Sequence, residues 1–300
     1  MKRAPPGKLI GLRQTRSRLP VVQQPILAAS RLAWADASGE LVDNGRMAFE
    51  WTGPWTTGAG VTERSFRLAR PAGGVPGVLW RPQPAASAPP VVLLGHGGSG
   101  HKRSERNVSL ARWFAARGIA AMAIDGPYHG DRVRAPMTPR EYQARIAAEG
   151  TEAVLDRMAG DWQAALAALG NLGVVRASNV GYLGLSMATR FGLPLAAVMG
   201  SRLRCAVFGK FGLVQGPALP EALAVPERVA ADARRVTSPV VFHVQWHDDV
   251  FPRDGQLRLF DLLGSADKQL IAYPGPHGET RPEAVVTWRA FIASHLARST

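Results

Sequence analysis

One serine stands at the point where a strand-like apolar run changes into a helix-like segment. Residues 180–183 are apolar or small, the next five are Gly184-Leu185-Ser186-Met187-Ala188, and a helical pattern continues to about Val198. A serine on such a tight turn presents its hydroxyl at the N-terminus of the following helix, and small residues on either side allow the turn to close. The pattern predicts a nucleophile elbow in which Ser186 is the nucleophile.

A serine hydroxyl is a weak nucleophile at neutral pH unless a base accepts its proton during the attack. Of the seven histidines, His277 follows the apolar segment 270–273, and Gly275 and Gly278 give its loop the freedom to reach Ser186. Asp248 and Asp249 follow another apolar segment, and a carboxylate there would orient the imidazole and stabilise its cation. These residue types predict base-assisted nucleophilic catalysis.

The oxyanion formed by such an attack needs two backbone N–H donors that are in place beforehand. The N–H of Met187 lies at the predicted helix start, where the helix dipole favours negative charge. The glycine-rich loop 95–100 follows a buried-strand pattern, and Gly98 is the expected second donor. This loop lacks the Gly-Lys-Ser/Thr ending of a phosphate-binding loop, and Arg103 stands where a third glycine of a dinucleotide fingerprint belongs. Nucleotide binding is therefore not predicted.

Strand and helix patterns alternate along most of the chain. We expect an antiparallel pair at 62–70 and 78–80, helices near 104–117, 139–169 (interrupted at Gly150) and 255–263, and a final helix from Pro282. Short buried strands alternating with helices predict a mostly parallel sheet that is covered on both faces. The loops that carry the candidate residues then lie together at the carboxyl ends of the strands.

The order serine, aspartate, histidine, each just past a strand, is that of the α/β-hydrolases. Over roughly residues 60–300 the chain resembles the dienelactone-hydrolase-like branch of that superfamily, through segments 75–82, 95–100, 125–132, 184–188 and 274–278. The resemblance implies an α/β-hydrolase fold with a small cap excursion at 212–226. It also implies a cofactor-free serine hydrolase that cleaves carboxylic esters, lactones or thioesters through an acyl-enzyme. In the family the acid commonly stands four residues before a loop proline; counting back from Pro252 selects Asp248, with Asp249 as the alternative.

The same loops bring three aromatic side chains, Tyr128, Trp246 and Phe251, to the predicted site. Apolar and aromatic walls of this kind suit compact acyl groups rather than long lipid chains. Arg132 and Arg253 lie in adjacent loops, where each could attract a substrate carboxylate or simply be solvated.

Composition indicates a folded chain, with 46% hydrophobic and 20% charged residues. Of the net charge of +13, residues 1–35 contribute +7 and contain no acid, and no nucleic-acid motif accompanies the basic residues. We expect a disordered basic extension at 1–22, a segment packing on the body at 23–60, and a catalytic domain at 61–300. No apolar run reaches the roughly 18 residues of a transmembrane helix, and the stretch 9–12 is too short for a signal peptide. A cytoplasmic protein without membrane or nucleic-acid partners is predicted.

Metal binding is not predicted, because no His-Glu-x-x-His or Cys-x-x-Cys pattern is present and His243 and His247 are expected on a strand and a loop. The single cysteine, Cys205, reads as a buried core residue. The alternative to an ester hydrolase is a non-catalytic binding protein of the same fold that uses its basic N-terminal tail to reach an acidic partner. The Ser186, Asp248 and His277 set favours the enzyme.

Overall fold

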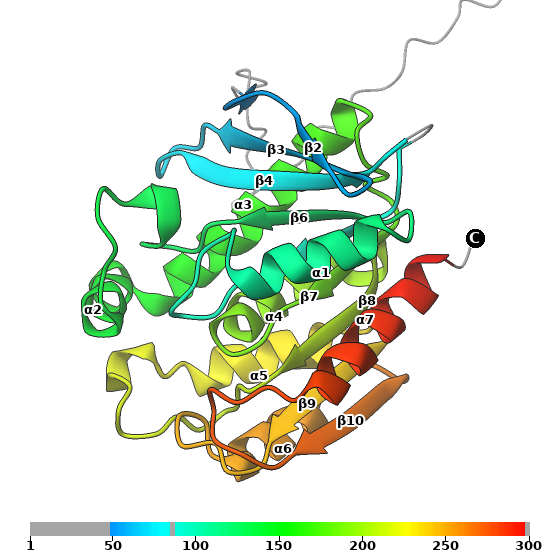
Figure 1. The fold of residues 1–300 in the computed structure, drawn as a ribbon. Helices are drawn as coiled ribbons and strands as arrows, with labels where there is room; N and C mark the ends of the chain where they lie inside the picture. The colour runs from blue at the N-terminus through cyan, green and yellow to red at the C-terminus, as the bar shows by residue number, and fades with distance from the viewer. Residues whose placement is uncertain (1–48, 85–87, 298–300) are drawn as a thin grey trace, which may run out of the picture. The chain divides into compact units, whose positions relative to one another are not determined.

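A computed structural model describes residues 49–84 and 88–297, which build one mixed sheet flanked by helices (Figure 1). The strand order is β1-β3-β4-β6-β5-β7-β8-β9-β10, with β2 paired to β3. The strands are β1 Phe49–Trp51, β2 Thr56–Gly58, β3 Val61–Leu68, β4 Val75–Pro82, β5 Val91–Leu94, β6 Ala120–Ile124, β7 Val180–Leu183, β8 Leu203–Gly209, β9 Val240–Gln245 and β10 Lys268–Tyr273. From β6 to β10 all neighbours are parallel, whereas β1 to β4 pair antiparallel. The mostly parallel sheet is confirmed.

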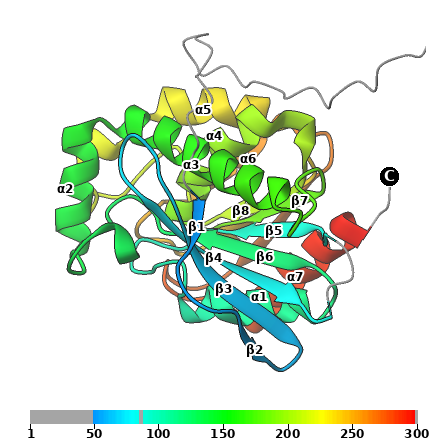
Figure 2. The ribbon, with the colours of Figure 1, turned by 90° about the horizontal axis from the view of Figure 1, so that it is seen from above.

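The helices form a layer on each face of this sheet, as Figure 2 shows. They are α1 Glu105–Ala115, α2 Pro139–Glu149, α3 Thr151–Asn171, α4 Met187–Met199, α5 Pro226–Arg235, α6 Arg253–Leu262 and α7 Pro282–Ala297. Helices α1 and α7 cover one face, and α3 to α6 cover the other. The excursion at 212–226 forms only a short 3-10 helix, Glu221–Leu223.

Both faces of the central strands are apolar, because both are covered by helices. In β5, Val91 and Leu93 contact the core on the α3–α6 side, and Val92 and Leu94 contact the core on the α1–α7 side. Successive strand residues point to opposite faces, so a strand buried on both sides reads as a continuous apolar run. The apolar runs from which these strands were predicted therefore reflect core packing on both faces of the sheet.

Glycine separates α2 from α3 at the predicted interruption. Gly150 has φ 97°, a conformation that residues with a Cβ rarely adopt. Helix α2 begins at a capping box, in which the Thr138 hydroxyl accepts from the Glu141 N–H and the Glu141 carboxylate accepts from the Thr138 N–H. These two local signals fix where α2 starts and ends, and hence which of its side chains face the candidate site.

The predicted extension at 1–22 and most of the segment 23–60 lie outside the described residues. Residues 49–58 contribute β1 and β2, which extend the sheet beside β3, and the Trp51 ring packs edge-on against Phe66 with centroids 6.3 Å apart. Across residues 49–84 and 88–297, no helix has the length and apolar character needed to cross a membrane.

Candidate active site

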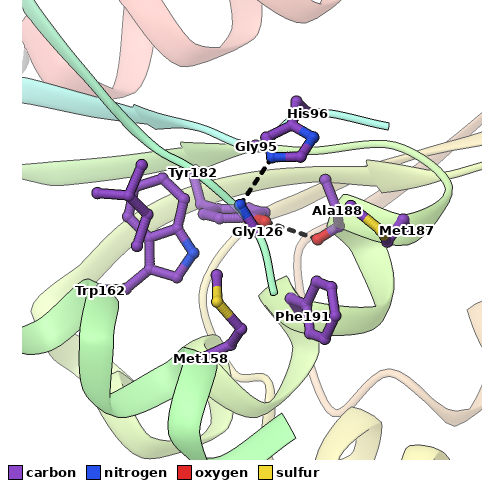
Figure 3. Close-up of a pocket in the computed structure, with 10 residues that line it drawn as sticks. Gly95, His96, Gly126, Met158, Trp162, Tyr182, Met187, Ala188 and Phe191 are labelled. Atoms are coloured by element: carbon purple, nitrogen blue, oxygen red, sulfur yellow. Dashed lines mark hydrogen bonds between the residues drawn. The ribbon is translucent and has the colours of Figure 1, made fainter. Parts of the chain in front are cut away.

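Ser186 occupies a strained turn between β7 and α4. Its backbone has φ 59° and ψ −123°, and its N–H donates to the Gly209 carbonyl at 2.9 Å. A Cβ at position 184 would lie 2.7 Å from the Ala188 Cβ and 2.7 Å from the Tyr182 hydroxyl, so glycine is required there. The Tyr182 hydroxyl donates to the Ala188 carbonyl at 2.6 Å (Figure 3). The turn is held by its own residues and by the end of the neighbouring strand β8, which preserves a conformation that costs on the order of 1–3 kcal/mol.

A continuous hydrogen-bonded chain runs from the serine to an aspartate. Ser186 Oγ lies 2.8 Å from His277 Nε2, and His277 Nδ1 lies 2.8 Å from Asp248 Oδ2 and 3.0 Å from Oδ1. With Nδ1 protonated and donating to the carboxylate, Nε2 is free to accept the serine proton. The three side chains follow β7, β9 and β10, at the carboxyl ends of parallel strands.

Asp248 is the acid that contacts the imidazole. Its Oδ1 accepts the N–H groups of Val250 at 2.9 Å and Phe251 at 2.8 Å, and its Oδ2 accepts from Gln256 Nε2 at 3.1 Å. Asp249 is exposed, and among the described residues its carboxylate accepts only the His277 backbone N–H, at 3.4 Å. The structure thus separates the two candidates: the side chain of Asp248 is buried against the ring, and that of Asp249 is not.

The Gly97–Gly98 peptide is oriented by a neutral histidine. The Gly97 carbonyl accepts the Gly100 N–H at 2.9 Å and lies 2.9 Å from His96 Nδ1. His96 Nε2 accepts the Gly126 N–H at 2.8 Å (Figure 3), so Nδ1 carries the proton of the neutral ring. Burial lowers the pKa of His96 to about 4, which keeps the ring uncharged at neutral pH. Because the carbonyl is held on one side, the Gly98 N–H of the same peptide faces the other way.

Both predicted oxyanion donors are free of protein acceptors. Within residues 49–84 and 88–297, neither the Gly98 N–H nor the Met187 N–H donates a hydrogen bond. The Tyr142 hydroxyl of α2 lies against Gly98, where a Cβ would come within 2.3 Å of it. His129 Nε2 lies 2.9 Å from the Gly98 carbonyl, and its ring centroid is 4.4 Å from that of Tyr142. Only glycine fits position 98, and α2 packs directly on this loop.

The three predicted pocket aromatics have different surroundings. Phe251 is buried, with its ring centroid 5.9 Å from that of His277. Trp246 is exposed, and the Arg253 guanidinium lies 4.5 Å from its ring centroid. Tyr128 donates to Glu149 Oε2 at 2.5 Å. In the described part of the chain, no hydrogen bond or ring contact joins Tyr128 or Trp246 to Ser186, His277 or Asp248, so only Phe251 borders the hydrogen-bonded chain directly.

Lys210 is a site residue that the sequence analysis missed. It follows β8 with φ 47°, is only 3% exposed, and donates from Nζ to the His277 carbonyl at 3.1 Å, to the Thr280 hydroxyl at 2.9 Å and to the Glu279 carbonyl. Burial lowers the pKa of Lys210 to about 8. Its signal in the sequence is a lone charge inside the apolar run 206–211. These hydrogen bonds hold the loop that carries His277 against the C-terminal end of β8.

The cavity in Figure 3 lies against Met187 and Ala188, the two residues of the elbow that line it. It is lined by Met158, Trp162, Tyr182 and Phe191 among others, and its volume of about 10 Å³ holds one water molecule at most. Cys205 is fully buried, and burial raises the pKa of its thiol to about 12. Among the described residues, no group of three or more histidine, cysteine or acidic side chains could hold a metal ion.

The class of protein follows from three features: the strand order of the sheet, the turn at Ser186, and the hydrogen-bonded chain from Ser186 through His277 to Asp248. Together they are those of an α/β-hydrolase. No family model and no curated protein matches the sequence. A solved structure described as a cold-adapted esterase from an Arctic intertidal metagenomic library is 33% identical, with a TM-score of 0.69, and the match covers 82% of this chain and 99% of that one. The chain belongs to the α/β-hydrolase esterase family, and the resemblance drawn from its motifs is confirmed. Hydrolysis of carboxylic esters is the activity that this similarity leads us to expect.

Two more distant structures share the fold. An acetyl xylan esterase from Paenibacillus sp. R4 is 16% identical, with a TM-score of 0.62, over 83% of this chain and 89% of its own. A protein described as a dienelactone hydrolase from Klebsiella pneumoniae is 18% identical, with the same TM-score, over 80% of this chain and 99% of its own. The architecture therefore persists while most of the sequence changes.

Proposed function

We propose that this protein is a serine hydrolase that cleaves carboxylic esters, lactones or thioesters through an acyl-enzyme intermediate. The observation that carries the proposal is the chain from Ser186 Oγ to His277 Nε2 at 2.8 Å and from His277 Nδ1 to Asp248 Oδ2 at 2.8 Å. In this arrangement the serine hydroxyl contacts a base, and the base contacts a carboxylate, as nucleophilic catalysis by serine requires. All three residues follow strands of the same sheet.

In the proposed reaction, Ser186 Oγ attacks the carbonyl carbon while His277 Nε2 accepts the hydroxyl proton. The resulting oxyanion receives the N–H groups of Met187 and Gly98. When the intermediate collapses, the bond to the leaving alcohol or thiol breaks and His277 returns the proton to it. A water molecule then attacks the acyl-enzyme with His277 as base, which releases the acid and restores Ser186. Asp248 remains ionised and stabilises the imidazolium throughout.

A compact acyl group suits the surroundings of Ser186. The excursion at 212–226 contributes one turn of 3-10 helix, which is too little to cover a lipid-binding groove. Buried rings of Phe211 and Phe251, with centroids 4.8 Å apart, lie on the His277 side. We expect kcat/KM in a p-nitrophenyl ester series from acetate to palmitate to be highest at or below about eight carbons. A maximum at palmitate would contradict the compact pocket.

Fluorophosphonate labelling tests the nucleophile directly. The purified protein should form a covalent adduct on the peptide that contains Ser186, seen by mass spectrometry, and Ser186→Ala should form none. Asp249→Asn, which changes an exposed carboxylate beside the site, is the matched control and should still be labelled. Absence of both labelling and ester turnover in the native protein would favour the non-catalytic binding protein instead.

A further inference from the structure

Arg190 is a deeply buried cation that has no carboxylate partner among the described residues. Arg132, one of the two loop arginines that could have attracted a substrate carboxylate, donates from Nη2 to Asp161 Oδ2 at 2.8 Å. Lys102, equally buried, lies 2.7 Å from Asp125 and 2.6 Å from Asp131. Arg190 is 7% exposed, and in the described part of the chain its side chain has one hydrogen bond, to Gln215 Oε1 at the long distance of 3.5 Å. Carboxylates neutralise Arg132 and Lys102, whereas in the described part of the chain no carboxylate contacts Arg190.

Its position is next to the nucleophile. Arg190 lies in the first turn of α4, and its backbone N–H donates to the Ser186 carbonyl at 3.2 Å. The guanidinium carbon lies 5.3 Å from the ring centroid of Phe211 and 6.0 Å from that of Phe251, which itself packs on His277. The guanidinium also interacts electrostatically with Tyr142, whose hydroxyl adjoins Gly98. The cation therefore lies close to the candidate site, and Phe251 lies near both this cation and His277.

An arginine in these surroundings is suited to bind an anion. Burial lowers the pKa of the Arg190 guanidinium to about 10, so it stays protonated at neutral pH. A buried charge without a counter-ion is unfavourable, and a carboxylate that accepts two parallel N–H groups removes that cost. Aromatic rings on a guanidinium favour the cation without occupying its N–H donors, which lie in the guanidinium plane.

We propose that Arg190 binds a carboxylate at the far end of the substrate's acyl group, so that monoesters of short dicarboxylic acids are the preferred substrates. This inference rests on the proposed function, because the ester carbonyl must lie at Ser186 while the second carboxylate reaches α4. The acyl chain then passes Phe251, whose ring lies near both His277 and Arg190, and the charge at its end distinguishes it from an apolar acyl chain of the same length.

Paired substrates test the charge separately from the chain length. Ethyl hydrogen glutarate and ethyl pentanoate have acyl groups of five carbons, and only the first carries a carboxylate. Arg190→Met should lower kcat/KM for the glutarate monoester about 10- to 100-fold, the range expected for a lost charge-assisted hydrogen bond, and change that for ethyl pentanoate less than about threefold. Arg190→Lys keeps the cation and should show a smaller, still selective loss. Arg253→Met, at the exposed arginine on Trp246, is the matched control and should alter neither.

Binding without turnover separates this proposal from the proposed reaction. Ethyl hydrogen glutarate is titrated calorimetrically into Ser186→Ala and into Ser186→Ala with Arg190→Met, and affinity should fall at least tenfold in the second. If the native protein hydrolyses no ester, the proposed function fails while this titration still decides the role of Arg190. Equal losses for both esters, or unchanged affinity in the double variant, would overturn the proposal. If Arg190→Met does not fold, selective loss in Arg190→Lys decides the question.

Discussion

The serine side and the histidine side of the candidate site are held in different ways. Around Ser186 the positions are set largely by backbone: a strained turn, a glycine that admits no Cβ, the bond from Tyr182 to the nearby Ala188 carbonyl, and the bond from the Ser186 N–H to the Gly209 carbonyl of the neighbouring strand. Around His277 they are set by side chains from distant segments, Asp248 beneath the ring and Lys210 beneath the loop. The first can be recognised from a few adjacent residues, whereas the second depends on contacts between positions 29 and 67 residues apart.

The largest expected effect comes from removing the nucleophile. Ser186→Ala should lower ester turnover on the order of a millionfold, because it removes the hydroxyl that attacks the ester and the backbone around it supplies no other nucleophile. Steady-state kinetics with p-nitrophenyl butyrate measure it, and circular dichroism checks that the fold is retained. Substantial activity in a clean Ser186→Ala preparation would falsify the assignment.

On the histidine side, Asp248→Asn should lower turnover roughly ten-thousandfold. The amide keeps the shape of the carboxylate but favours the wrong imidazole tautomer. Asp249→Asn is the control: its carboxylate meets only the His277 backbone N–H, and its turnover should change less than about tenfold. Comparable losses in the two variants would mean that the contacts of Asp248 do not determine the tautomer.

Lowering the pH should destabilise the folded protein through His96, which orients the Gly97–Gly98 peptide near Ser186. The pKa of His96 is about 4 in the folded protein, against 6.5 for a histidine side chain exposed to water, so between these values the unfolded chain binds a proton that the native chain does not. The free energy of unfolding therefore falls as the pH is lowered from 7.5 to 4.5, by about 2–3 kcal/mol for this residue. Urea titrations at the two pH values should show a smaller drop in His96→Asn. An unchanged drop would assign the acid sensitivity elsewhere, for example to His243, whose pKa burial also lowers to about 4.

Lys210→Met should lower kcat about tenfold with KM nearly unchanged, because it frees the histidine loop without removing a group that touches substrate. Lys268→Met is a matched control: its Nζ also donates to three groups, the carbonyls of Phe260, Asp261 and Leu263, none of which belongs to the site. Similar kinetic losses in both variants would show that the loss of a hydrogen-bonded lysine, rather than of the contact with the His277 loop, lowers the rate.

The smallest expected effect is a gain in stability. Glycine adopts positive φ at little cost, so Ser186→Gly should relieve the strained turn, although greater freedom of the unfolded chain offsets part of the gain. We expect the free energy of unfolding to rise by about 1 kcal/mol relative to Ser186→Ala, measured by urea titration of both variants. Equal stability would show that the turn stores no strain.

Much of the fold was predictable from local patterns. Strands with two covered faces read as unbroken apolar runs, as in β5 and β7, and Gly150 marks a helix boundary by a conformation that other residues avoid. The elbow was predictable for the same reason, because strand, small residues, serine and helix are adjacent in sequence. These features depend on interactions between near neighbours, which a single sequence contains.

The remaining parts of the site depend on tertiary contacts that no local pattern contains. Arg132 and Arg190 look alike in sequence, yet Asp161, 29 residues from Arg132, neutralises the first and nothing comparable reaches the second among the described residues. The exposure of Trp246 and the position of Tyr142 against Gly98 follow from how loops and α2 pack. Charge pairing between segments distant in sequence has to be seen in three dimensions.

The burial of Cys205 has a practical use. It is the single cysteine of the chain, and thiol reagents react with the exposed thiolate, which a fully buried thiol with a pKa near 12 does not supply. Maleimide dyes should therefore not label the native protein, so Cys205 does not have to be replaced before a labelling experiment. A cysteine introduced at the exposed Ala144 of α2 would carry a fluorophore at a single known position. Its fluorescence would then report changes in the environment of α2 when esters bind.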